Sequence, residues 1–156
     1  MKSTLTAAVA AMAISSSVLA AGNVSVEESV ELNVKPAAVW ALIGDYNALY
    51  RWHPAVASSD RNDNVRVLTL GNGAQLTETL TAQDDAAHSY SYTINTSPLP
   101  VADYDSTIEV TASGNGTSKV TWRSSFNAAG TSDTEAADVI RGVYRAGLDN
   151  LAKLYN

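Results

Sequence analysis

The chain has 156 residues, with a hydrophobic fraction of 46%, a charged fraction of 17%, a formal net charge of -6 and no cysteine. This length predicts one domain, and this composition is typical of a globular protein with enough apolar residues for a core. The negative charge argues against nucleic acid and against an anionic membrane surface as partners. The lack of cysteine excludes disulfides, thiolate metal sites and a cysteine nucleophile.

Residues 1–21 have the pattern of a secretory signal peptide. Lys2 supplies a positive start, residues 5–21 are mainly Ala, Leu, Val and Ile, and Ala20 and Ala21 are small residues suited to cleavage. The run is short and lacks flanking stop-transfer charges, so it is not typical of a membrane span; the alternative is a helix retained in the fold. We therefore expect a signal peptide over 1–21, a single domain over 22–156, and a periplasmic or secreted location after cleavage.

The predicted domain begins with a strand followed by short helices. Apolar and polar residues alternate over residues 24–34, which predicts a half-buried strand with Glu28 in an inward position. Pro36 is suited to the first position of a helix, and the apolar residues after it predict a helix over 37–43. Residues 46–50 fit a further short helical turn.

Residues 65–128 carry the signals of antiparallel strands joined by tight turns. Two Gly-Asn-Gly turns, at 71–73 and 114–116, each separate two runs of alternating apolar and polar residues. The Pro98-Leu99-Pro100 run interrupts the sheet locally. The strands predicted in this region cover residues 65–70, 74–82, 88–95, 102–112 and 118–128.

Residues 133–155 are predicted to form one long amphipathic helix. Ser132 and Glu135 fit a capping box at its start. Gly147 lies within the apolar stripe, where it permits either close backbone approach or a gap, and Gly142 lies on the solvent side. The order of elements predicts an α+β fold in which a curved antiparallel sheet wraps around this helix. The stripe, with spacings of three and four, consists of Ile140, Val143, Tyr144, Gly147, Leu148, Leu151, Leu154 and Tyr155.

The sheet face predicted to meet this helix carries polar groups among aromatic rings. A buried hydroxyl or carboxylate without a partner costs about 1–3 kcal/mol, whereas rings with a few convergent polar groups are typical of small-molecule pockets. The alternative is that tyrosine hydroxyls reach the rim of the sheet and glutamates lie at open strand ends. We interpret the set as the lining of a ligand cavity, with a gap beside Gly147. Its predicted members are Glu28, Trp40, Trp52, His53, Glu78, Tyr90, Tyr92, Tyr104, Ser106, Trp122, Phe126 and Gly147.

Several short segments resemble one known family in their order and spacing. Residues 39–46, Val-Trp-Ala-Leu-Ile-Gly-Asp-Tyr, followed by Trp52-His53-Pro54, resemble the entry segment of the START-like, polyketide cyclase-type proteins, also called SRPBCC proteins. The segments Glu78-Thr79-Leu80, Tyr90-Ser91-Tyr92, Pro98-Leu99-Pro100 and Val120-Thr121-Trp122 are also similar to that family.

This resemblance covers residues 24–156 and carries expectations of its own. It implies a helix-grip fold, in which a curved antiparallel sheet and a long C-terminal helix enclose an apolar tunnel. Members of the family bind lipids, hormones or polyketides, and some catalyse cyclisation or dehydration, so the fold does not choose among functions. With the predicted signal peptide, the Trp52-His53-Pro54 and Pro98-Leu99-Pro100 segments are most similar to the exported MxaD-like subset, which is associated with periplasmic methanol oxidation in bacteria.

The sequence offers few groups for acid–base or metal chemistry. The candidates are Asp45, His53, His88, Glu28 and Glu78. The two histidines lie far apart, without metal-site spacing, and no GxSxG nucleophile motif is present. If Glu28 and Glu78 both face the cavity, burial and repulsion would raise the pKa of one of them; the alternative is a polar cross-strand network. We predict no catalytic residue, no metal and no cofactor.

Three functions remain open from the sequence. The first is an exported, non-catalytic protein that binds a small apolar or amphipathic ligand between the sheet and the last helix. The second is a periplasmic accessory protein whose acidic surface steers it to a partner such as an oxidoreductase of the methanol-oxidation type. The third is a cyclase or dehydratase that uses Glu78 or His53 as its acid–base group. We favour the binding protein, because the sequence indicates no substrate for an enzyme.

Overall fold

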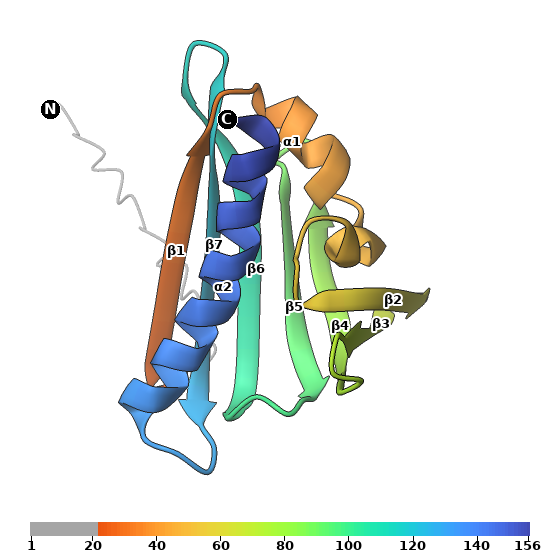
Figure 1. Ribbon diagram of the computed structural model, residues 1–156, viewed down its shortest axis with the longest axis vertical. Helices are drawn as coiled ribbons and strands as arrows, with labels where there is room; N and C mark the ends of the chain where they lie inside the picture. Colours follow the sequence, from red (N-terminus) through yellow and green to blue (C-terminus); the bar gives the residue numbers. More distant parts are fainter. Residues whose placement is uncertain (1–21) are drawn as a thin grey trace, which may run out of the picture.

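The computed structural model describes residues 22–156 and contains one antiparallel sheet with a long C-terminal helix packed on it. The sheet has seven strands in the order β1-β7-β6-β5-β4-β3-β2, so only the first strand is out of chain order. Figure 1 shows the helix α2 lying along β1 and β7. The predicted α+β helix-grip architecture is confirmed. The predicted signal peptide, at 1–21, lies outside the described residues.

The elements follow the predicted order, with one additional strand. They are β1 (Val24–Leu32), α1 (Pro36–Ile43), the 3-10 helix η1 (Tyr46–Arg51), β2 (Val56–Asn62), β3 (Val65–Leu70), β4 (Gln75–Asp84), β5 (Ser89–Thr96), β6 (Val101–Gly114), β7 (Thr117–Ala128) and α2 (Asp133–Tyr155). None of the helices within residues 22–156 combines the length and the apolar character that crossing a membrane requires.

The additional strand is β2, and it forms an edge of the sheet. Its sequence, VASSDRN, is mostly polar, and only Val56 and Ser59 are buried. Strand prediction relies on β-branched and aromatic residues in an alternating pattern, which this segment lacks. β2 exists because β3 offers it a ladder of backbone partners, from Val56 opposite Leu70 to Asn62 opposite Val65.

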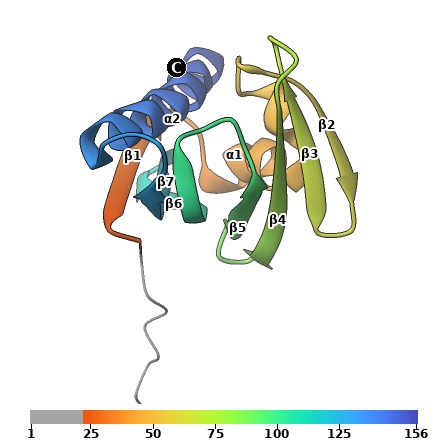
Figure 2. The same cartoon turned by 90° about the horizontal axis from the view of Figure 1, so that it is seen from below.

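Tight turns set the register of the sheet. Gly73 and Gly116 have φ values of 86° and 82°, a left-handed conformation that favours glycine, and each closes one of the predicted Gly-Asn-Gly turns. Alternation along β4 to β7 then directs the large side chains to one face, where Tyr90, Tyr92 and Trp122 are almost fully buried. The opposite face is exposed and rich in Thr, Ser and charged residues. Figure 2 shows the sheet curving, with α1 and α2 on its inner side.

The helix α2 is the second layer of the core. Its capping box is present: the Ser132 side chain accepts from the Glu135 N–H, and the Glu135 carboxylate accepts from the Ser132 N–H. Ile140, Tyr144 and the residues in register with them are buried as predicted. Leu154 departs from the predicted stripe, since it is 55% exposed. The reason is its position in the last turn, beside an open hollow between α2 and α1 rather than over the sheet.

Candidate functional site

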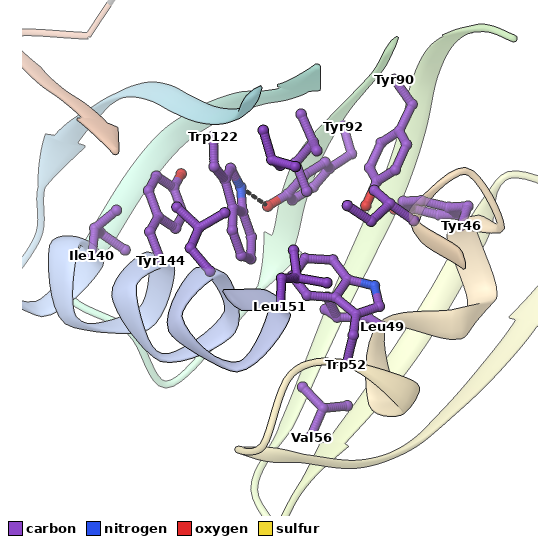
Figure 3. Close-up of a cluster of buried hydrophobic side chains, with 14 of the residues drawn as sticks. Tyr46, Leu49, Trp52, Val56, Tyr90, Tyr92, Trp122, Ile140, Tyr144 and Leu151 are labelled. Carbon is purple, nitrogen blue, oxygen red and sulfur yellow. Dashed lines mark hydrogen bonds between the residues drawn. The ribbon is translucent and has the colours of Figure 1, made fainter. Parts of the chain in front are cut away.

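An apolar cavity of about 90 Å³ lies between the inner face of the sheet, α2 and the segment that joins η1 to β2. We call residues 52–56, which comprise this connection and the first residue of β2, the 52–56 segment. The cavity is lined by Leu49, His53, Ala55, Val56, Leu68, Leu70, Leu76, Glu78, Tyr92, Ile94, Leu99, Tyr104, Trp122, Ile140, Val143 and Tyr144. In Figure 3, the side chains of Ile140 and Tyr144 extend from α2 toward Trp122 of the sheet, and Trp52 comes from the end of η1. The lining therefore gathers side chains from nearly every element of the domain.

The lining includes one member of a buried ion pair, Glu78. Glu78 on β4 lies opposite Arg66 on β3. Its Oε2 accepts a hydrogen bond from the Nε of Arg66 at 2.7 Å, and the Nη2 of Arg66 also lies 2.7 Å from this oxygen. Arg66 also donates to the backbone carbonyl of Tyr46, and its guanidinium lies 3.8 Å from the centre of the Tyr46 ring. Arg66 and Glu78 are 1% and 4% exposed, so both charges are removed from water and depend on each other.

The pKa values of this pair reflect burial and mutual attraction. Burial raises the pKa of Glu78, and Arg66 opposes that shift. Burial acts to lower the pKa of Arg66, but the Glu78 carboxylate outweighs it and the net direction is upward. Arg66 is therefore charged throughout the accessible pH range and holds Glu78 as its counter-ion. Both contacts of Arg66 end on Oε2 of Glu78.

Arg66 is not among the residues predicted to line the cavity, although the sequence contains a signal for it. Residues 65–70 contain apolar side chains of both parities, so alternation alone does not show which face of this strand is the inner one. Arg66 and Glu78 stand six positions before and after Asn72, the centre of the turn between β3 and β4. A symmetric hairpin pairs such residues, as it also pairs Leu68 with Leu76. Counting outward from the turn would have placed Arg66 beside the predicted inward Glu78.

A network of hydrogen bonds satisfies most of the polar groups on the inner face. The indole N–H of Trp122 lies 3.1 Å from both the Tyr92 hydroxyl and the Ser106 hydroxyl. Ser106 also lies 3.2 Å from the Tyr144 hydroxyl, which in turn bonds the Tyr104 hydroxyl. The rings support the same contacts, since Trp122 stacks on Tyr144 with centroids 4.3 Å apart. These groups satisfy one another, so their presence on the inner face does not by itself require a ligand.

His53 joins the 52–56 segment to α2. It is 3% exposed, and its Nε2 lies 2.8 Å from the backbone carbonyl of Val143. The Ala55 N–H lies 3.3 Å from its Nδ1. A backbone N–H can only donate, so Nδ1 is the acceptor and Nε2 carries the proton that is donated to Val143. Burial lowers the pKa of His53, and the backbone hydrogen bonds only partly oppose this shift.

The predicted gap beside Gly147 is wrong. A Cβ placed on Gly147 would lie 2.8 Å from Cδ2 of His53, 2.9 Å from Cζ3 of Trp52 and 3.2 Å from Cζ3 of Trp122. The missing side chain therefore allows close packing of three rings against the helix backbone. The cavity lies nearer the N-terminal half of α2, beside Ile140, Val143 and Tyr144. Gly142 faces open space, as predicted.

The remaining predicted members of the lining lie elsewhere in the structure. Glu28 is at the junction of β1 and α2, where it pairs with Arg141 and Arg145, both at 3.3 Å. Trp40 donates to Asp85 near the turn between β4 and β5. The structure brings His53, Glu78, Tyr92, Tyr104 and Trp122 together around the cavity. It places Trp52, Tyr90, Ser106 and Phe126 in the surrounding buried core.

The chemistry available in the cavity is that of apolar contact with a few hydrogen bonds. The Glu78 carboxylate is held by Arg66, and both nitrogens of His53 are engaged with backbone groups. Across residues 22–156, no three His, Asp or Glu side chains come close enough together to hold a metal ion. At about 90 Å³ the cavity is smaller than the roughly 150 Å³ that accommodates benzene in an engineered protein core. A larger ligand requires the cavity to expand.

Comparisons with known proteins agree with this architecture. The sequence profile of the family described as polyketide cyclase / dehydrase and lipid transport matches residues 23–156. The search of functionally curated proteins found no match. The protein XoxI from Bacillus cereus is 34% identical in sequence, with a TM-score of 0.83 over 85% of this chain and 95% of XoxI.

Two further solved structures are similar. A protein from Thermobifida fusca is 30% identical, with a TM-score of 0.75 over 84% of this chain and 92% of that protein. The Streptomyces aromatase/cyclase Zhui has a TM-score of 0.65 over 83% of this chain and 92% of its own. Zhui is only 16% identical in sequence, so its similarity concerns the fold alone.

Proposed function

This chain belongs to the polyketide cyclase / dehydrase and lipid transport family, and from that premise we propose that it binds a small apolar or amphipathic molecule without transforming it. The site of binding is the cavity between the sheet and α2. The observation that carries the proposal is an apolar cavity whose lining includes one buried carboxylate, that of Glu78, paired with Arg66 behind it. Such a lining suits a ligand with a mainly hydrocarbon body and one hydrogen-bonding group.

The geometry favours binding over catalysis. An acid–base catalyst must exchange a proton with its substrate, and Glu78 is instead fixed as the counter-ion of a buried arginine. His53 donates to one backbone group and accepts from another, which leaves neither ring nitrogen available to a substrate. Glu78 lines the cavity, and its carboxylate is a hydrogen-bond acceptor that suits a ligand hydroxyl.

We place the protein in the exported, MxaD-like subset of its family, as a periplasmic or secreted protein after cleavage of residues 1–21. The support is the signal-peptide pattern together with the Trp52-His53-Pro54 and Pro98-Leu99-Pro100 segments. Mass spectrometry of the mature protein from the extracellular or periplasmic fraction tests this assignment. We expect a chain that begins close to Gly22, and a full-length chain in the cytoplasm would contradict it.

The binding proposal is tested with a small neutral fluorophore, 1-aminoanthracene, and a matched pair of variants. Val143→Phe adds a ring to a residue that lines the cavity, whereas Val139→Phe adds the same ring to a 40% exposed position one turn earlier. We expect saturable fluorescence enhancement with wild type and with Val139→Phe, and a loss of at least about tenfold in affinity with Val143→Phe. Equal affinity for the two variants would exclude the cavity as the binding site.

Native mass spectrometry complements this assay. Protein purified from its own host should carry an added mass that a denaturing spectrum lacks, and the Val143→Phe protein should carry less of it. A mass identical to that of the bare chain, together with no fluorophore binding, would contradict the proposed function.

A further inference from the structure

The cavity is too small for the ligands that its fold and lining suit. Ligand pockets in proteins are commonly about 300–1,000 Å³, whereas this cavity has about 90 Å³. Most of its wall is formed by the sheet and by α2, which backbone ladders and a continuous helix hold in place. Two parts of the wall belong to no helix or strand: His53 and Ala55, in the 52–56 segment, and Leu99, in the connection between β5 and β6. The 52–56 segment is therefore one of two places where the wall can move to admit a ligand.

Specific hydrogen bonds attach the 52–56 segment to α2. The Nε2–H of His53 donates to the Val143 carbonyl at 2.8 Å, and the Nδ2–H of Asn150 donates to the Trp52 carbonyl at 2.9 Å. Between these two bonds, Gly147 lets the rings of Trp52 and His53 approach the helix backbone closely. Of these contacts, only the His53 bond involves a group that changes charge near neutral pH.

The surroundings of His53 suit the neutral imidazole, although its Nε2–H can donate to Val143 in either protonation state. A second proton would go to Nδ1, where it would face the Ala55 N–H and replace an acceptor with a donor. The resulting charge would lie in a mainly apolar cavity, where desolvation disfavours it. Protonation therefore removes the Ala55 bond within the 52–56 segment, leaves the Val143 bond in place, and puts a charge where burial disfavours it, which favours exposure of the ring to water.

The groups around His53 provide no unpaired negative charge to stabilise its protonated form. Its neighbours across the close contact at Gly147 are Trp52 and Trp122, which do not titrate. The titratable residues that share the cavity are Glu78 from β4, Tyr92 from β5, Tyr104 from β6 and Tyr144 from α2. Glu78 is the counter-ion of Arg66, and the tyrosine hydroxyls are neutral at physiological pH.

We propose that the 52–56 segment is the entrance of the cavity and that His53 makes its opening dependent on pH. At neutral pH, His53 holds the segment against the Val143 carbonyl of α2 and the cavity keeps its small volume. In mildly acidic solution, protonated His53 leaves this position, the segment moves outward, and ligand enters and leaves faster. This inference rests on the proposed function, because it concerns the regulation of the same cavity.

The test measures how fast 1-aminoanthracene associates with the full-length mature protein by stopped-flow fluorescence, from about pH 8 to about pH 5. For wild type, we expect the association rate to rise as the pH falls. The largest possible increase is about tenfold for each pH unit by which the pKa of His53 in the open form exceeds its pKa in the form with the Val143 contact. His53→Gln keeps a side-chain donor that does not titrate, so its rate should stay low at every pH. His53→Phe keeps a ring but removes the donor, so its rate should stay high.

His88→Gln is the matched control. His88 is the other histidine of the chain; it lies in the turn before β5, with its ring 5.6 Å from that of Trp40, and outside the cavity lining. The His88→Gln protein should keep the pH dependence of wild type. Nuclear magnetic resonance of wild type provides a readout that needs no variant: the His53 ring, the Ala55 amide and the Gly147 amide should titrate together.

The outcomes separate this inference from the proposed function. Binding with an association rate that does not depend on pH, or a pH dependence that persists in His53→Gln, would overturn the inference and leave the binding site intact. Titration of the His53 ring without any change at Ala55 and Gly147 would overturn it as well. Absence of fluorophore binding at every pH would instead overturn the proposed function, and this inference with it.

Discussion

A pair of glycine-to-alanine substitutions on α2 measures how closely the helix approaches the 52–56 segment. Gly142 and Gly147 lie in the interior of the same helix, so alanine at either position gains the same intrinsic helix propensity, about 1 kcal/mol. The surroundings differ. No heavy atom lies within 4 Å of a Cβ at Gly142, whereas a Cβ at Gly147 would meet three ring carbons at 2.8–3.2 Å.

The magnitude follows from those contacts. Carbon atoms pack best at about 3.5–4.0 Å, so the Gly147→Ala methyl group must displace buried rings. Trp52 and Trp122 are 1% and 2% exposed, and Trp122 is stacked on Tyr144, so neither indole has free space to move into. Overpacking of this kind costs about 1–3 kcal/mol. Gly142→Ala should therefore stabilise the protein by about 1 kcal/mol, and Gly147→Ala should be less stable than Gly142→Ala by about 1–3 kcal/mol.

Urea denaturation followed by far-ultraviolet circular dichroism measures both free energies of unfolding under identical conditions. The expected result is opposite or clearly unequal shifts of the midpoint with an unchanged slope. Equal stabilisation by both alanines would refute the reasoning, because it would mean that the rings around Gly147 move aside without cost. The same result would restore the gap beside Gly147 that the sequence predicted.

Three further predictions concern other parts of the domain. Glu78→Gln leaves the charge of Arg66 buried without its counter-ion, so it should lower the free energy of unfolding, measured in urea, by about 3–5 kcal/mol. The double variant Arg66→Met with Glu78→Leu removes both charges and should lose far less stability. Equal losses in the two variants would contradict the ion-pair account. Burial lowers the pKa of His53 in the folded protein. Wild type should therefore lose stability relative to His53→Gln as the pH falls below about 6.5, the pKa of a histidine in the unfolded chain. Parallel curves of stability against pH for the two proteins, from about pH 8 to about pH 5, would be the contrary result. Ser132→Ala removes the cap of α2 and should cost about 1 kcal/mol in a thermal or urea titration, while Ser132→Asp should stay near wild type; an alanine variant as stable as wild type would show that the cap contributes nothing.

Local patterns in the sequence predicted the parts of the structure that depend on backbone geometry. Successive residues of a strand must point to opposite faces, so alternation correctly placed Tyr90, Tyr92 and Trp122 on the inner side of the sheet. The capping box at Ser132 depends only on residues three positions apart, and it is present as predicted.

Features that depend on contacts between distant segments were not predictable in the same way. Whether Gly147 faces a gap or a ring depends on the position of the 52–56 segment, which no local pattern encodes. The hydroxyl network joins Tyr92, Tyr104 and Tyr144 from three different elements, so the sequence revealed polar groups without their partners. Arg66 is intermediate, because hairpin symmetry about Asn72 could have identified it once the register was assumed.

The central claim, that the cavity between the sheet and α2 holds the ligand, is tested most directly by methyl-labelled nuclear magnetic resonance during a titration with 1-aminoanthracene. The account predicts the largest shifts at the methyl groups of Leu68, Ile94 and Ile140, which line the cavity on β3, β5 and α2. Leu154, in the exposed last turn of α2, serves as the reference for binding at the surface. Shifts confined to Leu154 and its neighbours, with the cavity methyl groups unchanged at saturation, would contradict the account.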